Sequence, residues 1–127
     1  MSEVQALILD DSSVMRKIIA RALRQADLGQ LEVFEAGSGI EAMEILGGQP
    51  IHLILSDINI PGMDGIEFLR QIQARYPEIP VVIISTESSA SSVKQSIQAG
   101  VRAYIRKPFT ADQVKERVVP LLQVPAL

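Results

Sequence analysis

The stretch LILSDINIPGMDG, residues 53–65, decides the fold, because an apolar run of strand length stops on a single aspartate, Asp57. A strand that is apolar at every position is typical of a parallel sheet that helices cover on both faces. In open sheets of that kind, ligands bind beyond the carboxyl ends of the strands. We therefore expect a buried strand over residues 52–56 and a ligand-binding role for Asp57.

Apolar runs of similar length recur on either side of this one. They lie at residues 6–9, 31–36, 81–85 and 103–106. Segments of helix length separate the runs, at residues 12–26, 39–46, 64–76, 89–99 and 110–122. Strands that alternate with helices run parallel, with right-handed crossovers. The pattern predicts an α/β fold, a doubly wound five-stranded parallel sheet in the order 2-1-3-4-5, which is the flavodoxin-like (βα)5 arrangement.

The first helical segment is amphipathic. Val14, Ile18, Ala22 and Ala26 fall on one stripe, whereas Arg16 falls elsewhere. We expect this stripe to face the sheet.

Glycine and proline mark where the helices should stop. Glycine accommodates the left-handed conformation that often ends a helix. The glycines expected in this role are Gly29, Gly47, Gly48 and Gly100. Pro120 should kink or end the last helix, because proline lacks the N–H group that the helix needs. We expect one domain over residues 1–122 and a short tail at residues 123–127.

Composition excludes several classes of protein. Of the 127 residues, 47% are hydrophobic and 21% are charged, values typical of one globular domain with a sizeable core. The net charge of -3 argues against direct nucleic-acid binding, and the absence of cysteine excludes disulfides and thiolate metal sites. The chain starts without the positive charge of a secretory signal and has no membrane-spanning apolar run. We therefore expect a cytoplasmic protein without membrane insertion.

Polar residues follow the predicted strands at the edge where the carboxyl ends meet. They are Asp10 and Asp11, Asp57, Ser85 and Thr86, and Arg106, Lys107 and Pro108. Three carboxylates at one edge repel one another, and a site with few oxygen ligands suits Mg²⁺. A lysine and a hydroxyl opposite the metal would neutralise phosphoryl oxygens. Asp57 at the centre is then the candidate nucleophile, since carboxylates form aspartyl phosphates.

Four motifs, taken in order, resemble the receiver domain of bacterial two-component response regulators, the CheY-like family. The motifs are LILDDSSVMRKII (7–19), SDINIPGMDGIEFL (56–69), VVIIST (81–86) and QAGVRAYIRKPFT (98–110). The resemblance implies that Asp57 accepts a phosphoryl group from a sensor histidine kinase or a phosphotransfer protein. Such a domain is no enzyme in the usual sense, but a phosphoacceptor that assists its own phosphorylation and dephosphorylation.

The resemblance also implies a Mg²⁺ site. Asp11, Asp57 and the backbone carbonyl of Asn59 would bind the metal, and Asp10 would hold it partly through water. Lys107 would pair with the phosphoryl group, and the peptide bond between Lys107 and Pro108 would be cis.

The same resemblance implies a switch. The hydroxyl of Ser85 stands the family's usual distance before the lysine and would bond the phosphoryl group. Thr86 occupies a position where the family usually has a smaller residue, so its side chain would narrow access for the phosphodonor. Tyr104 matches the aromatic position that swings inward as the hydroxyl moves, a population shift between two states.

The predicted output is docking, because the chain leaves no room for an effector domain. The resemblance implies a stand-alone, chemotaxis-type receiver that binds a downstream protein through its fourth helix, fifth strand and fifth helix. Two alternatives remain open: a receiver-like scaffold that works without phosphorylation, and a small nucleotide- or flavin-binding protein of the same fold class. The nucleotide- or flavin-binding alternative is suggested by GSGIEA, residues 37–42, which fits a dinucleotide-binding pattern.

Overall fold

The apolar run that ends at Asp57 forms the central strand of a five-stranded sheet in the computed structural model, which describes residues 3–60, 62–86 and 89–122. All strand pairs in this sheet are parallel, and the order is β2-β1-β3-β6-β7. The strands are β1 (Glu3–Leu9), β2 (Gln30–Ala36), β3 (Leu53–Ser56), β6 (Val81–Ser85) and β7 (Ala103–Arg106). The predicted doubly wound α/β fold and its strand order are confirmed.

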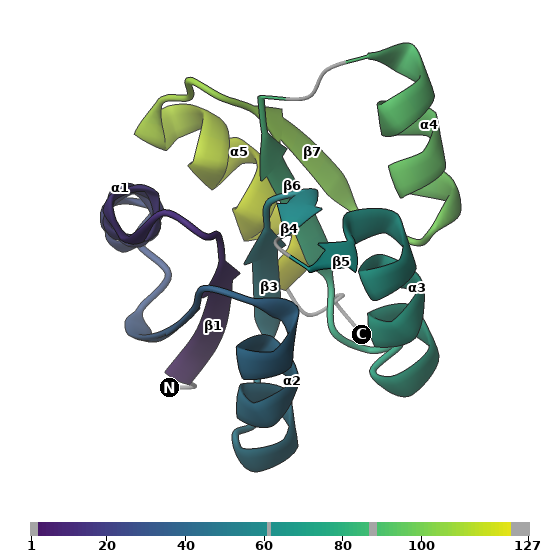
Figure 1. Ribbon diagram of the computed structural model, residues 1–127. Helices are drawn as coiled ribbons and strands as arrows, with labels where there is room; N and C mark the ends of the chain where they lie inside the picture. The colour runs from purple at the N-terminus through teal and green to yellow at the C-terminus, as the bar shows by residue number, and fades with distance from the viewer. Residues whose placement is uncertain (1–2, 61, 87–88, 123–127) are drawn as a thin grey trace, which may run out of the picture.

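Helices cover both faces of the sheet (Figure 1). They are α1 (Ser13–Gln25), α2 (Gly39–Gly48), α3 (Gly65–Arg75), α4 (Ala90–Gln98) and α5 (Ala111–Leu122). One core lies between the sheet and α1 with α5, and the other lies on the opposite face, mainly under α2 and α3. Successive strand residues alternate between the two, so that Leu53 and Leu55 belong to the first core and Ile54 to the second. This alternation explains why β3 and β6 are apolar at every position before their last residue, a serine.

A two-stranded hairpin follows Asp57, and the sequence did not predict it. Its strands, β4 (Asn59–Ile60) and β5 (Met63–Asp64), are antiparallel and too short to show a hydrophobic period. The Asp64 side chain accepts a hydrogen bond from the backbone N–H of Ile66 and caps α3. The hairpin therefore fixes the path from the end of β3 into α3.

The prediction that one apolar stripe of α1 faces the sheet is wrong for the first half of the helix. Val14 and Ile18 are 68% and 48% exposed, whereas Ala22 and Ala26 are buried, as is Ile19. Residues four positions apart in a helix are offset by about 40° around the helix axis. A row of residues spaced only by four therefore moves gradually away from the face that packs on the sheet. The face that packs on the sheet combines steps of three and four residues.

One predicted helix end also differs. Gly29 and Gly100 have positive φ angles near helix ends, as expected, but α2 continues through Gly47 and ends at Gly48. The last helix extends to Leu122, the end of its predicted range, so Pro120 does not end it. Pro120 is exposed and lies in the last turn, where one backbone carbonyl that loses its helical partner can bond water. The predicted tail, residues 123–127, lies outside the described residues.

Gly65→Ala should lower the free energy of unfolding by at least about 2 kcal/mol, because an added Cβ would overlap the backbone carbonyl of Ile58. Gly47→Ala is the matched control. Its Cβ would meet no atom within 4 Å on an exposed helical site, so stability should rise by about 0.5–1 kcal/mol. Urea unfolding followed by circular dichroism measures both changes. Equal stabilities for the two variants would contradict the packing described for Gly65.

Candidate functional site

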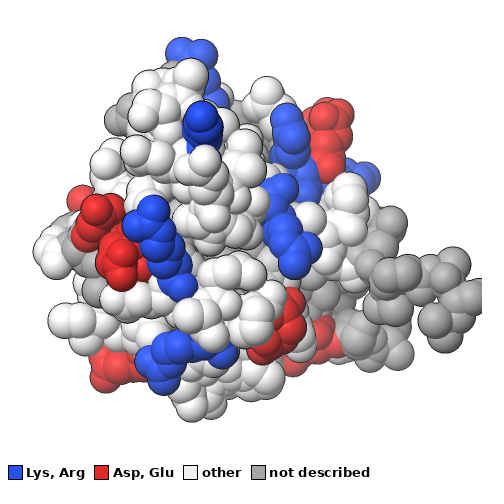
Figure 2. Space-filling model, turned by 90° about the vertical axis from the view of Figure 1, so that its right-hand side faces the viewer, with Lys and Arg blue, Asp and Glu red and all other residues white. Residues whose placement is uncertain are grey.

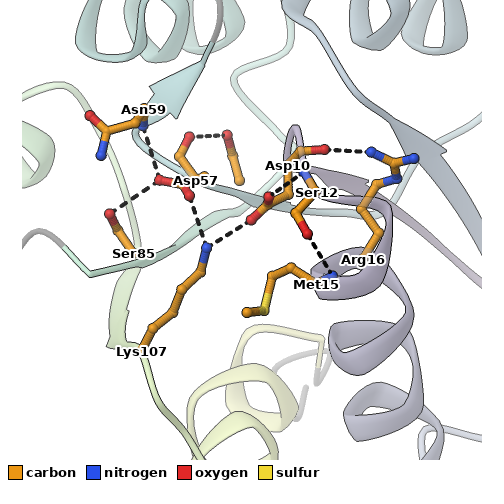
Figure 3. A network of polar contacts seen from close by, with 9 residues as sticks. Asp10, Ser12, Met15, Arg16, Asp57, Asn59, Ser85 and Lys107 are labelled. Atoms are coloured by element: carbon orange, nitrogen blue, oxygen red, sulfur yellow. Dashed lines mark hydrogen bonds and ion pairs between the residues drawn. The ribbon is translucent and has the colours of Figure 1, made fainter.

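The carboxyl ends of four parallel strands bring together Asp10, Asp57, Ser85 and Lys107 (Figure 3). The Lys107 ammonium donates to Asp10 Oδ2 at 2.8 Å and to Asp57 Oδ2 at 2.9 Å. The Ser85 hydroxyl donates to Asp57 Oδ1 at 3.1 Å. These four residues were each predicted from the strand ends, and the sheet gathers them into one hydrogen-bonded group.

Backbone contacts fix Asp57 at the centre of this group. Its N–H donates to the Leu9 carbonyl at 2.9 Å, which continues the pairing of β3 with β1 by one residue. The Asn59 N–H donates to Asp57 Oδ1 at 3.0 Å, and the Ser56 hydroxyl donates to the Asp57 carbonyl at 2.8 Å. The carboxylate is therefore held in one orientation although it lies just beyond the sheet.

Asp10 is buried at the end of β1, with 2% of its surface exposed. Its Oδ1 accepts a hydrogen bond from the Ser12 N–H at 2.9 Å, and its Oδ2 accepts one from Lys107. Its backbone carbonyl accepts a hydrogen bond from Arg16 Nη1 at 2.6 Å. The two donors to its carboxylate offset the desolvation that disfavours a buried charge.

The charge of Lys107 is stabilised where it lies. Burial lowers the pKa of its ammonium, but the hydrogen bonds to Asp10 and Asp57 and their negative charges raise it by more, so the pKa lies above the ordinary 10.5. The stabilisation that follows is complete below pH 10.5 and is lost as the pH rises through the folded-state pKa. Lys107 is thus a permanent cation between two carboxylates at neutral pH.

Oxygen atoms of Asp10 and Asp57 converge on one cation, here the ammonium of Lys107. Within the described ranges, no three acidic or histidine side chains gather as a metal site. Asp11, the third predicted carboxylate, is exposed beside this pair, and its part in metal binding stays a prediction. Mg²⁺ is usually held by one or two carboxylates, with waters and substrate phosphate completing its shell, and the converging pair fits that use.

The other predicted site residues surround this group. Thr86 is exposed directly after β6, and Asn59 is exposed at the start of β4. The Lys107–Pro108 peptide bond is cis, as predicted. Tyr104 lies on β7 opposite Ile83 of β6 and packs, partly buried, against the core on the α2 and α3 side.

The glycine-rich segment at residues 37–42 does not lie at the centre of the sheet. It follows β2, which is an edge strand, whereas ligands in this fold class bind where the strand order reverses, between β1 and β3. Its position favours the site around Asp57 over a nucleotide site.

A sequence model of the response regulator receiver domain matches residues 6–119. The chain belongs to this family. Receiver domains of the CheY type generally use Mg²⁺, work with histidine kinases and are not classical enzymes.

The receiver domain is similar to chemotaxis proteins over nearly its whole length. It is 35% identical to a CheY homolog of Campylobacter jejuni over 94% of this chain and 92% of that protein. It is 37% identical to CheY of Pseudomonas aeruginosa over 94% of this chain and 97% of that protein. The structure of CheY4 from Vibrio cholerae superposes with a TM-score of 0.84 at 26% identity, over 95% of this chain and all of that one.

Two residues near the site, Arg16 and Glu35, were not predicted from the sequence to have a role there. Arg16 was placed on the polar side of α1, yet it contacts the Asp10 carbonyl and forms an ion pair with Glu35 of β2. The signal that could have found the pair is a glutamate directly before the end of a largely apolar strand. A charge in that position predicts a partner from the neighbouring helix.

Lys107→Met should lower the free energy of unfolding at neutral pH by about 2 kcal/mol, because it leaves two carboxylates facing each other without a cation. Urea unfolding of the variant and of the wild type at neutral pH measures the difference. A variant as stable as the wild type would contradict the assigned role of Lys107.

Proposed function

We propose that this receiver domain is a phosphorylation-activated response regulator of the chemotaxis type, with Asp57 as the phosphoacceptor. The observation that carries the proposal is the position of the Asp57 carboxylate, held between the Lys107 ammonium at 2.9 Å and the Ser85 hydroxyl at 3.1 Å. The chemotaxis role rests on similarity to CheY proteins along nearly the whole chain. The donor would be a sensor histidine kinase or a phosphotransfer protein.

In the proposed reaction, a carboxylate oxygen of Asp57 attacks the phosphorus atom. The new bond to Asp57 forms as the bond between phosphorus and the donor's leaving group breaks, and the leaving group keeps the electron pair. The Lys107 ammonium and the Ser85 hydroxyl then donate to phosphoryl oxygens, where negative charge develops, instead of to the carboxylate. Attack by water on the phosphorus atom later restores the carboxylate and releases phosphate.

A Mg²⁺ ion would neutralise charge on the phosphoryl oxygens when bound. We assign Asp10, Asp57 and Asp11, with the backbone carbonyl of Asn59, to hold the ion. The convergence of Asp10 and Asp57 on one cation supports this assignment. Lys107 must then release Asp10, which frees its ammonium for the phosphoryl group.

We place the receiver unit at residues 1–122, in line with the family match at residues 6–119. None of the helices in the described part of the chain is long and apolar enough to cross a membrane. Phosphotransfer from a kinase would place the protein in the cytoplasm.

The downstream protein would dock on the face formed by α4, β7 and α5. A groove of about 430 Å³ lies there, lined by Val93, Ile97 and Tyr104 together with the cationic side chains of Arg106 and Arg117. Figure 2, which views the side of α3 and α4, shows Lys and Arg side chains separated by uncharged surface, with acidic side chains among them. Tyr104 connects the groove to the site, because it lies on β7 next to the strand that ends at Ser85. Movement of Ser85 toward a phosphoryl group would favour the state in which Tyr104 turns inward.

Incubation with acetyl phosphate and Mg²⁺ should add the mass of one phosphoryl group to the intact protein. The gain should vanish in Asp57→Asn and when the metal is chelated, because both remove a part that the transfer needs. Intact mass spectrometry and a phosphate-affinity gel measure the gain. A phosphorylation-independent scaffold would show no gain, and a gain retained in Asp57→Asn would place the phosphate on another residue.

Beryllofluoride, a mimic of the phosphoryl group, should shift the resonances of Tyr104 and leave those of Tyr76 in place. The chain has only these two tyrosines, and Tyr76 lies at the end of α3, at the opposite edge of the sheet from Asp57. NMR of the tyrosine-labelled protein with Mg²⁺ and beryllofluoride measures both, with Asp57→Asn as control. Unchanged Tyr104 resonances in a protein that binds beryllofluoride would contradict the proposed switch.

A further inference from the structure

Arg16 reaches the site from the side of Asp10 opposite to Lys107 (Figure 3). Its Nη1 donates to the Asp10 backbone carbonyl at 2.6 Å, and its Nε donates to Glu35 Oε1 at 2.9 Å. Only 17% of the Arg16 side chain is exposed. One guanidinium therefore joins the end of β1, the start of α1 and the end of β2.

The anchor of this guanidinium is itself held firmly. Lys17 donates to Glu35 Oε2 at 2.6 Å, so both oxygens of the carboxylate are paired. The hydrogen bond from Lys17 lowers the pKa of Glu35, and that from Arg16 lowers it further, against an opposing effect of burial. Gly37 leaves room for the guanidinium, since a Cβ there would lie 3.3 Å from Arg16 Nη1.

In the proposed function, Asp10 loses one of its donors. In the structure, Lys107 contacts Asp10 Oδ2, the Ser12 N–H donates to Oδ1, Arg16 donates to the backbone carbonyl, and the Asp10 N–H donates to the Ala36 carbonyl at 3.1 Å. Release of Lys107 would leave the other three contacts. Of these three, only the contact from Arg16 comes from a side chain, and it is also the shortest.

We propose that Arg16, anchored by Glu35, is a positioning residue that keeps the Asp10 carboxylate aimed at the metal. This inference rests on the proposed function, in which Asp10 helps to hold Mg²⁺. Residues that orient metal ligands through a second contact commonly change metal affinity by about 10- to 100-fold when they are replaced.

The charge of Arg16 and its contact with Asp10 predict opposite effects of its removal on the affinity for Mg²⁺. The inference can therefore be tested. Arg16 is a cation close to the metal ligands, so its removal should tighten the binding of a dication if charge alone mattered. Loss of the contact to the Asp10 carbonyl should weaken the binding instead. Lys17 is the matched control, because it pairs with the same glutamate, is 72% exposed and has no described contact with Asp10.

Isothermal titration of Mg²⁺ into the whole protein measures the affinity without any phosphodonor. We expect Arg16→Gln to weaken Mg²⁺ binding about tenfold, and Lys17→Gln to leave it within about twofold. Arg16→Lys keeps the charge but cannot donate to the Asp10 carbonyl and to Glu35 as a fork, so it should also weaken binding. Circular dichroism and urea unfolding identify any variant that fails to fold. If Arg16→Gln fails to fold, the Mg²⁺ affinity of Arg16→Lys tests the inference instead.

Unchanged or tighter Mg²⁺ binding by folded Arg16→Gln, or full affinity in Arg16→Lys, would overturn the positioning role alone. Equal weakening in Lys17→Gln would also overturn it, because a loss shared by both variants would point to the ion pairs of Glu35 and not to Asp10. Failure of the wild type to bind Mg²⁺ would overturn the proposed metal step and this inference with it. The wild-type titration therefore separates the two failures.

Discussion

The contact of one ammonium with two carboxylates is the constraint on which the site depends. Asp10 and Asp57 end neighbouring strands and are both largely buried, so their charges could not remain together without a cation between them. Lys107 supplies that cation from the end of β7, two strands away from β3 in the sheet. The site can therefore form only when β1, β3, β6 and β7 are paired, which links its geometry to the stability of the fold.

The two hydrophobic cores give that sheet its rigidity and leave one edge for chemistry. β3 and β6 contribute alternate side chains to the core on either face and become polar only at their carboxyl ends. Polar groups at this edge are bonded to one another and to the backbone and do not point into the core. Tyr104 is the point at which site and surface meet, because it packs on one core and lines the groove beside α4.

Much of this arrangement could be predicted, because it follows from patterns that are local in the sequence. Unbroken apolar runs identify buried parallel strands, and the residues that end them must meet at one edge; this placed Asp57, Ser85 and Lys107 correctly. The register of α1 could not be read from its apolar residues, because Val14 and Ile18 look like core residues and are exposed. Arg16 was missed for a related reason: its partners lie on two strands, and their distance from α1 depends on how the helix is rotated against the sheet.

The ammonium of Lys107 can also be regarded as a tethered counter-ion. A dissolved cation leaves a site on dilution, whereas a side chain stays at a local concentration that the chain sets and that does not change with the surrounding solution. At the proposed metal site, binding of a dication would be an exchange of one cation for another. The free energy of the ion pairs that Lys107 makes would then be subtracted from the affinity for the metal, so the strength of these pairs would set the metal concentration at which the domain begins to respond.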